Sequence, residues 1–376
     1  MRIIAVFSVC VFLAYITPSK YLKQVLLINS CLIAWLGYAL NTENQYDLIF
    51  HFDMYDYLIG KSIEDVFSYY YTLESPLYVL YVYFLGFFKN KHILPAVTVF
   101  IGYYTFSYFL SYCVKKDSLS KKVYMPIYLL ILCALPWHDF SAGIRGALAF
   151  SICAWAAFFD FVKKEKIKGL AFYIASVFIH QAAIGALLVS LLVHATTKYN
   201  KKVKVGIFIT ILATGLLIRQ INTLISFLAN STGLNILQTI ANSFASYVVQ
   251  GNDLYEYRIV IIRALVSIIA LFYISTCEFS AENEFLYKKR KEIVYYYTVF
   301  VGLTFAFVWQ YDVFCRYSVA TTLLLPLVLT SYGSAPIVFR LGKIKDRSYG
   351  IVMCVVAIFV LVINYGSYYS HWRFGG

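Results

Sequence analysis

Long apolar segments alternate with short polar clusters along almost the whole chain. The segments run for roughly 15 to 25 residues, the length that an α-helix needs to cross a bilayer. The strict alternation that marks the strands of a transmembrane β-barrel is missing. We therefore predict an all-α polytopic integral membrane protein with about ten to twelve transmembrane or re-entrant helices. The predicted spans cover residues 3–16, 25–40, 76–88, 93–114, 123–137, 142–162, 169–194, 205–218, 258–276, 294–310, 317–332 and 348–365.

Two polar insertions interrupt the spans, but no linker or internal repeat divides them, so we expect one membrane domain over residues 1–376. Residues 41–75 are rich in Asp and Glu and carry Lys61 alone as a cation, which predicts an external acidic loop. Residues 219–257 are predicted as a second external loop. Apolar residues at helical spacing within it favour either an amphipathic interfacial helix or a partly buried loop helix.

Clusters of lysine and arginine predict which ends of the spans face the cytoplasm. They lie at residues 115–122, 163–168, 198–204, 288–291 and 340–347. Basic clusters flank residues 169–194 on both sides, so we predict a hairpin of two half-length helices that turns near His180 and Gln181. This hairpin places His180 on the external side. Lys89 and Lys115 also flank a single span on both sides, although one span should have a basic cluster at its cytoplasmic end only. The sequence pattern alone does not resolve this conflict.

Composition excludes several functional classes. The chain is 61% hydrophobic and 14% charged, with a mean hydropathy of +0.71, which is too apolar for a soluble domain. The formal charge of +13 comes from cations between apolar segments, so we expect no nucleic-acid partner. The eight cysteines form no CxxC pair and read as small hydrophobic residues. Zinc-binding, phosphate-loop and nucleophile-elbow motifs are missing, and we predict no metal and no cofactor.

Ionisable residues in or beside apolar segments are costly to insert, so by default they line a pocket or a path. Arg145 begins one span and offers a fork of donors suited to phosphate oxygens, although a snorkelling arginine would look the same. His180 lies in a strongly apolar segment, where it is either a proton acceptor or a hydrogen-bonded packing residue. Arg316 is a third candidate, with a helical salt bridge to Asp312 as the competing explanation.

Glu74 precedes Pro76, which can start the next helix. Its carboxylate would orient a substrate hydroxyl or pair with an arginine, or it simply favours the helix N-terminus. Aromatic residues crowd the same boundary, where some are interfacial anchors and others can stack on sugar rings.

These segments together resemble the EpsG family of Wzy-type polysaccharide polymerases. The resemblance covers residues 45–335 and rests on Glu74–Tyr78, Ile144–Ala149, Phe178–Ala183 and Arg316–Tyr317. Its most specific feature is the arginine that begins a span, followed about 35 residues later by the apolar histidine segment. Gly146 and Gln181 depart from the family's usual residues, whereas Arg145 and His180 are retained. The Asp-Tyr pair of the family's first external loop corresponds either to Asp53 or to Asp56–Tyr57.

The resemblance implies a GT-C-like glycosyltransferase of the bacterial inner membrane, acting at its periplasmic face without a metal. It would join undecaprenyl-pyrophosphate-linked oligosaccharides into an O-antigen, capsule or exopolysaccharide. Arg145 and Arg316 would hold the pyrophosphate, while His180 or Glu74 positions or deprotonates the acceptor hydroxyl. The further binding candidates are Tyr317, Asp53 and His138.

The partners implied are the lipid-linked oligosaccharide, membrane lipid and a chain-length regulator. One alternative is an O-antigen ligase, in which the arginine and histidine residues would have the same roles. The other is a lipid-linked oligosaccharide transporter or flippase. A transporter would carry its unusual polar residues at mid-membrane in paired broken helices, and this chain gathers them at one face.

Overall fold

Helices make up nearly all of the chain that the structure describes. The computed structural model describes residues 2–40, 46–232, 254–276, 281–332, 338–339, 342–343 and 353–361. The first half holds α1 (Arg2–Ile16), η1 (Ser19–Tyr21), α2 (Leu22–Tyr38), α3 (Tyr46–Leu58), α4 (Ile63–Ser68), η2 (Tyr70–Thr72), α5 (Pro76–Gly86), α6 (Ile93–Asp117), α7 (Lys121–Ala134), α8 (Trp137–Ser141), α9 (Ile144–Ala157) and the π-helix η3 (Phe158–Lys163). The second half holds α10 (Lys166–Ile179), η4 (Gln181–Ala183), α11 (Ile184–Thr196), α12 (Lys201–Thr232), α14 (Leu254–Thr276), α15 (Ala281–Ala306), α16 (Tyr311–Leu329) and η5 (Thr330–Tyr332). A two-residue ladder pairs β1 (Val338–Phe339) with β2 (Gly342–Lys343).

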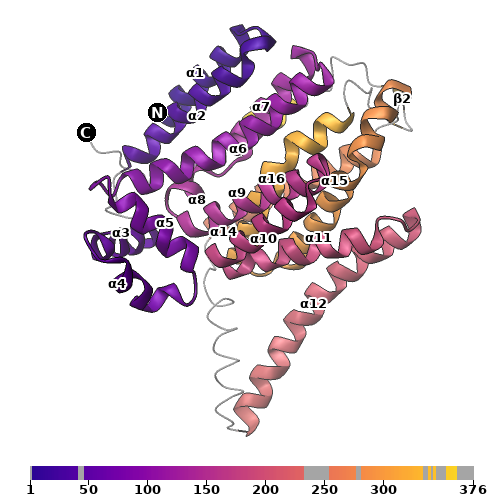
Figure 1. Cartoon of the computed structure of the whole chain (residues 1–376). Helices are drawn as coiled ribbons and strands as arrows, with labels where there is room; N and C mark the ends of the chain where they lie inside the picture. The colour runs from indigo at the N-terminus through magenta and orange to yellow at the C-terminus, as the bar shows by residue number, and fades with distance from the viewer. Residues whose placement is uncertain are drawn as a thin grey trace.

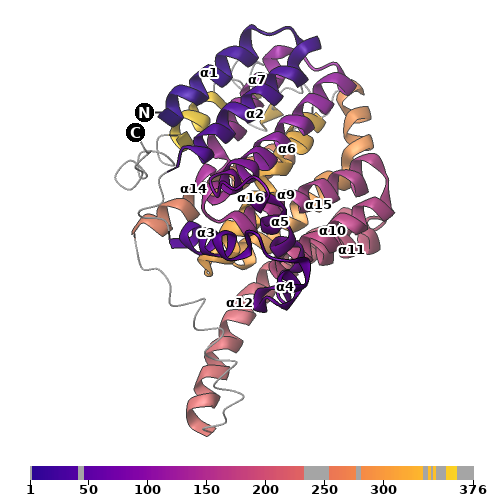
Figure 2. The same ribbon diagram turned by 60° about the vertical axis from the view of Figure 1, so that its left-hand side comes forward.

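The prediction of an all-α membrane protein is confirmed. Among the described residues, three helices are long and apolar enough to cross a membrane: Ile93–Asp117, Ile144–Lys163 and Tyr311–Leu329. They pack against one another at the centre of the bundle (Figures 1 and 2). Shorter apolar helices accompany them, namely Arg2–Ile16, Pro76–Gly86, Gln181–Thr196 and Ile259–Ser275.

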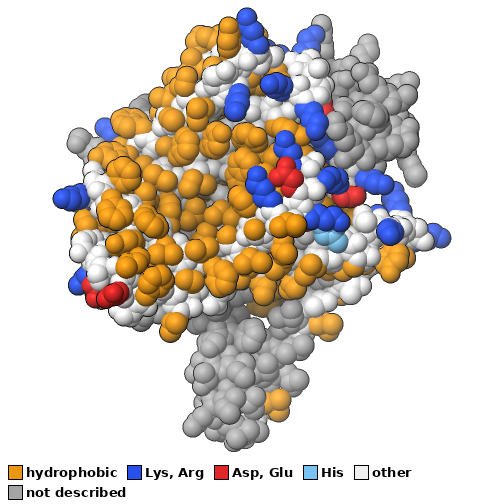
Figure 3. Space-filling model, viewed as in Figure 1, with side chains coloured by type: hydrophobic (Ala, Val, Ile, Leu, Met, Phe, Trp, Pro, Cys, Tyr) orange, Lys and Arg blue, Asp and Glu red, His pale blue; other side chains and the backbone are white. Residues whose placement is uncertain are grey.

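The outer surface of the bundle suits a lipid environment. Hydrophobic side chains cover most of the face shown in Figure 3, and most of its Lys and Arg side chains gather in the upper and right-hand parts of that face. On α10 and α11, exposed apolar residues recur at helical spacing. They include Leu170, Ile174 and Phe178 on one helix and Ile184, Leu188 and Leu191 on the other. An aqueous solvent would oppose such a continuous apolar face, whereas lipid tails accept it.

The bundle has a basic end and an acidic end. We define the basic end by residues 115–122 and 163–168, where the buried Arg290 binds Asp117 and donates to the Thr330 hydroxyl at 2.6 Å. The acidic end is formed by α3, α4 and α8 with the first turns of α5, α9 and α16. The helix α6 runs from one end to the other, so Lys89 and Lys115 lie at opposite ends. The flanking conflict in the sequence is thereby resolved.

The predicted hairpin is also present. The helix α10 ends at Ile179, and His180 adopts an extended backbone (φ −152°, ψ 117°) before η4 and α11 lead away. Each half has only 14 and 13 helical residues, respectively, too short to cross a bilayer alone. Because the basic residues 163–168 precede α10, the turn at His180 lies at the acidic end.

The two insertions differ from simple loops. The first contains α3 and α4, which fold back on the bundle: the Tyr55 hydroxyl accepts from the Asn90 amide at 2.8 Å, and Lys91 pairs with Asp56 at 2.8 Å. In the second, α12 continues to Thr232 and projects away from the other helices (Figure 1). The amphipathic helix predicted from the apolar spacing after residue 233 lies outside the described residues.

Candidate functional site

Arg145 lies in the first turn of α9, at the acidic end, as the sequence predicted. Its Nη1 donates to the Tyr71 hydroxyl and reaches the Ser75 hydroxyl at 3.4 Å. The guanidinium carbon also lies 5.0 Å from the centre of the Tyr71 ring. All of these contacts are with uncharged groups, so the charge of Arg145 stays uncompensated by any ion pair within the described residues.

Arg316 lies beside the start of α9. The helix α16 begins at Tyr311, earlier than the span predicted from residue 317, so Arg316 stands on its second turn. A Cβ atom built on Gly146 would lie 3.5 Å from Cγ of Arg316, which shows how closely the two helices approach. The expected salt bridge to Asp312 does not form, and Arg316 makes no ion pair or hydrogen bond with any other described residue.

The other two arginines in the described core behave differently. Arg263 on α14 pairs with Asp139 (Nη2 to Oδ1, 2.8 Å), and its side chain is only 4% exposed. Arg290 pairs with Asp117 at the basic end. A buried guanidinium normally needs such a carboxylate, because its desolvation is costly. Arg145 and Arg316 thus form a pair of neighbouring positive charges without one.

Asp47, on α3, is the acidic group that senses both of these charges. Desolvation raises the pKa of its carboxyl, and the guanidinium groups of Arg316 and Arg145 oppose that rise. It nevertheless forms no ion pair with either arginine among the described residues. Neither arginine is therefore neutralised by an ion pair with α3.

His180 is buried at the turn between α10 and η4. The Ala182 amide donates to its Nδ1 at 3.2 Å, so the neutral imidazole carries its proton on Nε2. Arg316 and Arg145 lie close enough for their positive charges to act on the imidazole. The side chain is therefore a neutral hydrogen-bond donor close to both guanidinium groups.

The other predicted residues take distinct positions. Tyr317 is buried and donates to the Ala182 carbonyl at 3.2 Å, so its hydroxyl fixes the His180 turn. His138 lies half-buried on α8, beside Asp139, and burial lowers its pKa to about 4. Glu74 is exposed just before α5, which starts at Pro76 as predicted, and its carboxylate bonds to no described residue. It is not brought into contact with Arg145.

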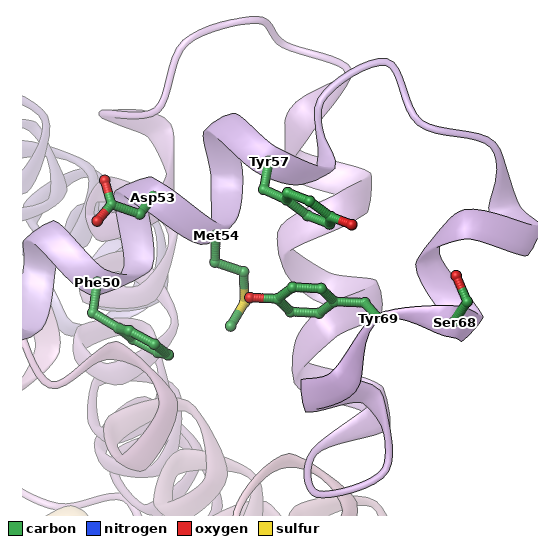
Figure 4. A pocket seen from close by; sticks show the side chains of 6 residues that line it. All are labelled: Phe50, Asp53, Met54, Tyr57, Ser68 and Tyr69. Carbon is green, nitrogen blue, oxygen red and sulfur yellow. The ribbon is translucent and has the colours of Figure 1, made fainter.

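Asp53 lies away from the guanidinium pair, in an open groove that we call the α3 groove. The groove is lined by Phe50, Asp53, Met54, Tyr57, Ser68 and Tyr69 and has a volume of about 590 Å³ (Figure 4). The α3 residues share one face of their helix, because they are spaced three and four apart. The volume falls within the roughly 300–1,000 Å³ of small-molecule sites.

Two residues of this region were missed in the sequence. His51 is buried on α3, where its Nδ1 shares a hydrogen bond with the Tyr78 hydroxyl at 2.7 Å. Burial lowers the pKa of His51 to about 3, with Arg145 contributing. Arg263 also donates to the Cys315 carbonyl at 3.0 Å, one residue before Arg316. Arg263 is an ionisable residue inside the apolar stretch 258–276, which is the criterion that identified Arg145. The same criterion could therefore have identified Arg263 from the sequence.

Comparison with known proteins identifies one family. A family model described as the EpsG family matches residues 24–373, nearly the whole chain. No curated protein and no solved structure matches.

Proposed function

The chain belongs to the EpsG family of Wzy-like polysaccharide polymerases, and from this premise we propose that it joins undecaprenyl-pyrophosphate-linked oligosaccharide repeat units into a surface polysaccharide. In this proposal the reaction takes place at the periplasmic face of the bacterial inner membrane. The acidic end, which carries Arg145, Arg316 and His180, would be that face, since the clusters of lysine lie at the other end.

The reaction exchanges a glycosyl phosphate bond for a glycosidic bond. The bond between the anomeric carbon of the growing chain and its pyrophosphate oxygen breaks, and a bond from that carbon to an acceptor hydroxyl oxygen forms. The hydroxyl proton is released, and undecaprenyl pyrophosphate leaves with the bonding electron pair. Negative charge therefore develops on the pyrophosphate oxygen in the transition state, and stabilising that charge is the main task of the site.

The observation that carries the proposal is the pair of guanidinium groups without a carboxylate. Pyrophosphate oxygens accept paired hydrogen bonds from arginine, and both Arg145 and Arg316 have donors that no described acidic residue uses. Two fixed positive charges at partly buried positions would stabilise the leaving group without a metal ion. Tyr71 and Ser75 support this reading, since they orient Arg145 without cancelling its charge.

His180 would position the acceptor or the leaving oxygen by donating a hydrogen bond from Nε2. Action as a general base would require the other tautomer, with a proton on Nδ1, and that proton would face the Ala182 N–H. Of the two roles open from the sequence, positioning is thus the one that the hydrogen bonding favours.

The test measures polymer length in a strain that lacks the gene, complemented with the wild type or with Arg145→Ala, Arg316→Ala or His180→Ala. Loss of either arginine should reduce polymer formation at least about 100-fold, with membrane abundance unchanged. Lys91→Ala is the matched control, because Lys91 lies at the same end but already pairs with Asp56.

The fate of the substrate separates the alternatives. A lost polymerase should leave single repeat units outside the inner membrane, whereas a lost flippase should leave them inside. A lost ligase should leave long chains on their lipid carrier. Normal polymer from Arg145→Ala and Arg316→Ala would refute the proposed anion site.

A further inference from the structure

The α3 groove has the surface chemistry of a carbohydrate site. Aromatic rings of Phe50, Tyr57 and Tyr69 provide flat apolar area, and the Asp53 carboxylate and Ser68 hydroxyl provide hydrogen-bonding groups (Figure 4). Tyr57 and Tyr69 pack against each other, with ring centres 4.9 Å apart. Stacking on such rings combined with acceptors for hydroxyl groups suits a sugar ring, which has apolar faces and polar edges.

Asp53 is the polar group in the groove whose state points to a ligand. Its carboxylate is exposed and forms no hydrogen bond or ion pair with the described residues. Three residues further along the same helix, Asp56 is paired with Lys91. An ionised carboxylate can accept hydrogen bonds from two neighbouring hydroxyls, so Asp53 is available to a sugar in a way that Asp56 is not.

The groove adjoins Tyr71, the residue whose hydroxyl binds Arg145. The ring of Phe50, on the groove wall, lies 5.5 Å from the ring of Tyr71. The Tyr71 hydroxyl in turn accepts from Arg145. A molecule with its pyrophosphate between Arg145 and Arg316 would therefore extend its sugars across the Phe50 and Tyr71 rings toward Asp53.

We propose that the α3 groove is a glycan subsite that binds an uncharged sugar ring of the lipid-linked repeat unit, on the sugar side of the pyrophosphate. This inference rests on the proposed function. The six residues that line the groove include one carboxylate and no cation, and Lys61, whose Nζ lies 5.3 Å from the centre of the Tyr57 ring, balances that carboxylate, so the groove as a whole suits an uncharged sugar. The groove sets which glycan is accepted, while Arg145 and Arg316 bind the carrier that every repeat unit shares.

The test uses the full-length protein in lipid nanodiscs and the lipid-linked repeat unit isolated from a strain lacking the gene. The variants are Asp53→Asn and Tyr57→Leu, with Asp56→Asn and Phe67→Leu as matched controls. Phe67 is 59% exposed and stands outside the groove lining. All four positions are exposed, so the substitutions should leave folding intact, which thermal unfolding checks.

Asp53→Asn should raise the KM for the lipid-linked unit about tenfold, the usual loss for a hydrogen bond to a charged group. Tyr57→Leu should do the same, with kcat within about twofold of the wild type. Inhibition by added undecaprenyl pyrophosphate should be unchanged, because that product contacts Arg145 and Arg316 rather than the groove. The two controls should match the wild type.

A second measurement tests the groove without relying on catalysis. The repeat unit is released from its lipid by mild acid hydrolysis, and its binding to the wild type and to Asp53→Asn is compared by titration calorimetry. Weaker binding to Asp53→Asn supports the subsite even if no polymer is made, in which case only the proposed function fails. Unchanged KM and unchanged binding in both groove variants would overturn the subsite, even with an active polymerase.

Discussion

The ion pair between Arg263 and Asp139 ties three helices together behind the site. Arg263 extends from α14, Asp139 belongs to α8, and the same guanidinium donates to the Cys315 carbonyl at 3.0 Å and the Ser318 hydroxyl at 3.2 Å on α16. The two side chains are 4% and 22% exposed, respectively. Removing one partner leaves a largely buried charge without compensation, and replacing both leaves none.

The magnitudes follow from that burial. Arg263→Met alone or Asp139→Leu alone should destabilise the protein by about 3–5 kcal/mol, the cost of breaking a buried pair. The double variant should lie within about 2 kcal/mol of the wild type, because apolar replacements of similar volume often compensate. The coupling free energy between the two positions should then be at least about 4 kcal/mol, well above the additivity error of distant sites.

The assay is the free energy of unfolding of all four proteins in bicelles, combined as a double-mutant cycle. Polymer length in complemented cells measures the effect on function. Because Arg263 binds the backbone just before Arg316, the Arg263→Met variant should make shorter polysaccharide chains even where its abundance in the membrane is normal. Strictly additive effects of the two substitutions would refute the reasoning, since they would mean that the pair contributes nothing as a pair.

Three further predictions concern single residues. His51 is neutral when folded, whereas a free histidine takes up a proton below about pH 6.5, so this residue should cost about 2 kcal/mol of stability between pH 7 and pH 5; in thermal unfolding scans His51→Gln should reduce the pH-dependent loss by that amount, while His138, whose pKa is also lowered, still contributes. Gly102→Ala should destabilise by about 1–3 kcal/mol, because the new Cβ would overlap the Phe140 ring, and an unchanged melting temperature would contradict this packing. Tyr71→Phe should lower polymerase rate about tenfold, less than Arg145→Ala, because the ring contact survives while the hydrogen bond is lost.

The helical bundle could be predicted because the lengths of the apolar stretches and the positions of the basic clusters can both be read from short parts of the sequence. The turn at His180 shows this well: basic clusters at both ends of one apolar stretch are reconciled by a reversal of the chain, and the helix breaks there. The span between Lys89 and Lys115 resisted the same logic. That conflict is resolved by α6, which runs from one end of the bundle to the other and so separates the two lysines.

The candidate site was only partly predictable. Arg145, His180 and Arg316 each stood out as charges in apolar surroundings, and the fold brings them to one end. Whether one of these residues keeps an unpaired charge depends on partners that lie far away in the sequence. The sequence pattern does not identify those partners. Arg316 has a carboxylate four residues earlier and does not use it, whereas the overlooked Arg263 binds Asp139, far away in sequence.

The contrast between the arginines explains why the anion site can persist in a stable protein. Two neighbouring positive charges repel each other and resist burial, so a fold that keeps them must gain stability elsewhere. Arg263 and Arg290 avoid that penalty, because each is paired with an aspartate, one behind the site and one at the opposite end of the bundle. Arg145 and Arg316 remain half-buried and are held only by neutral groups or by packing. Their charge is therefore available to a ligand, and binding a pyrophosphate would relieve repulsion that the empty site must sustain.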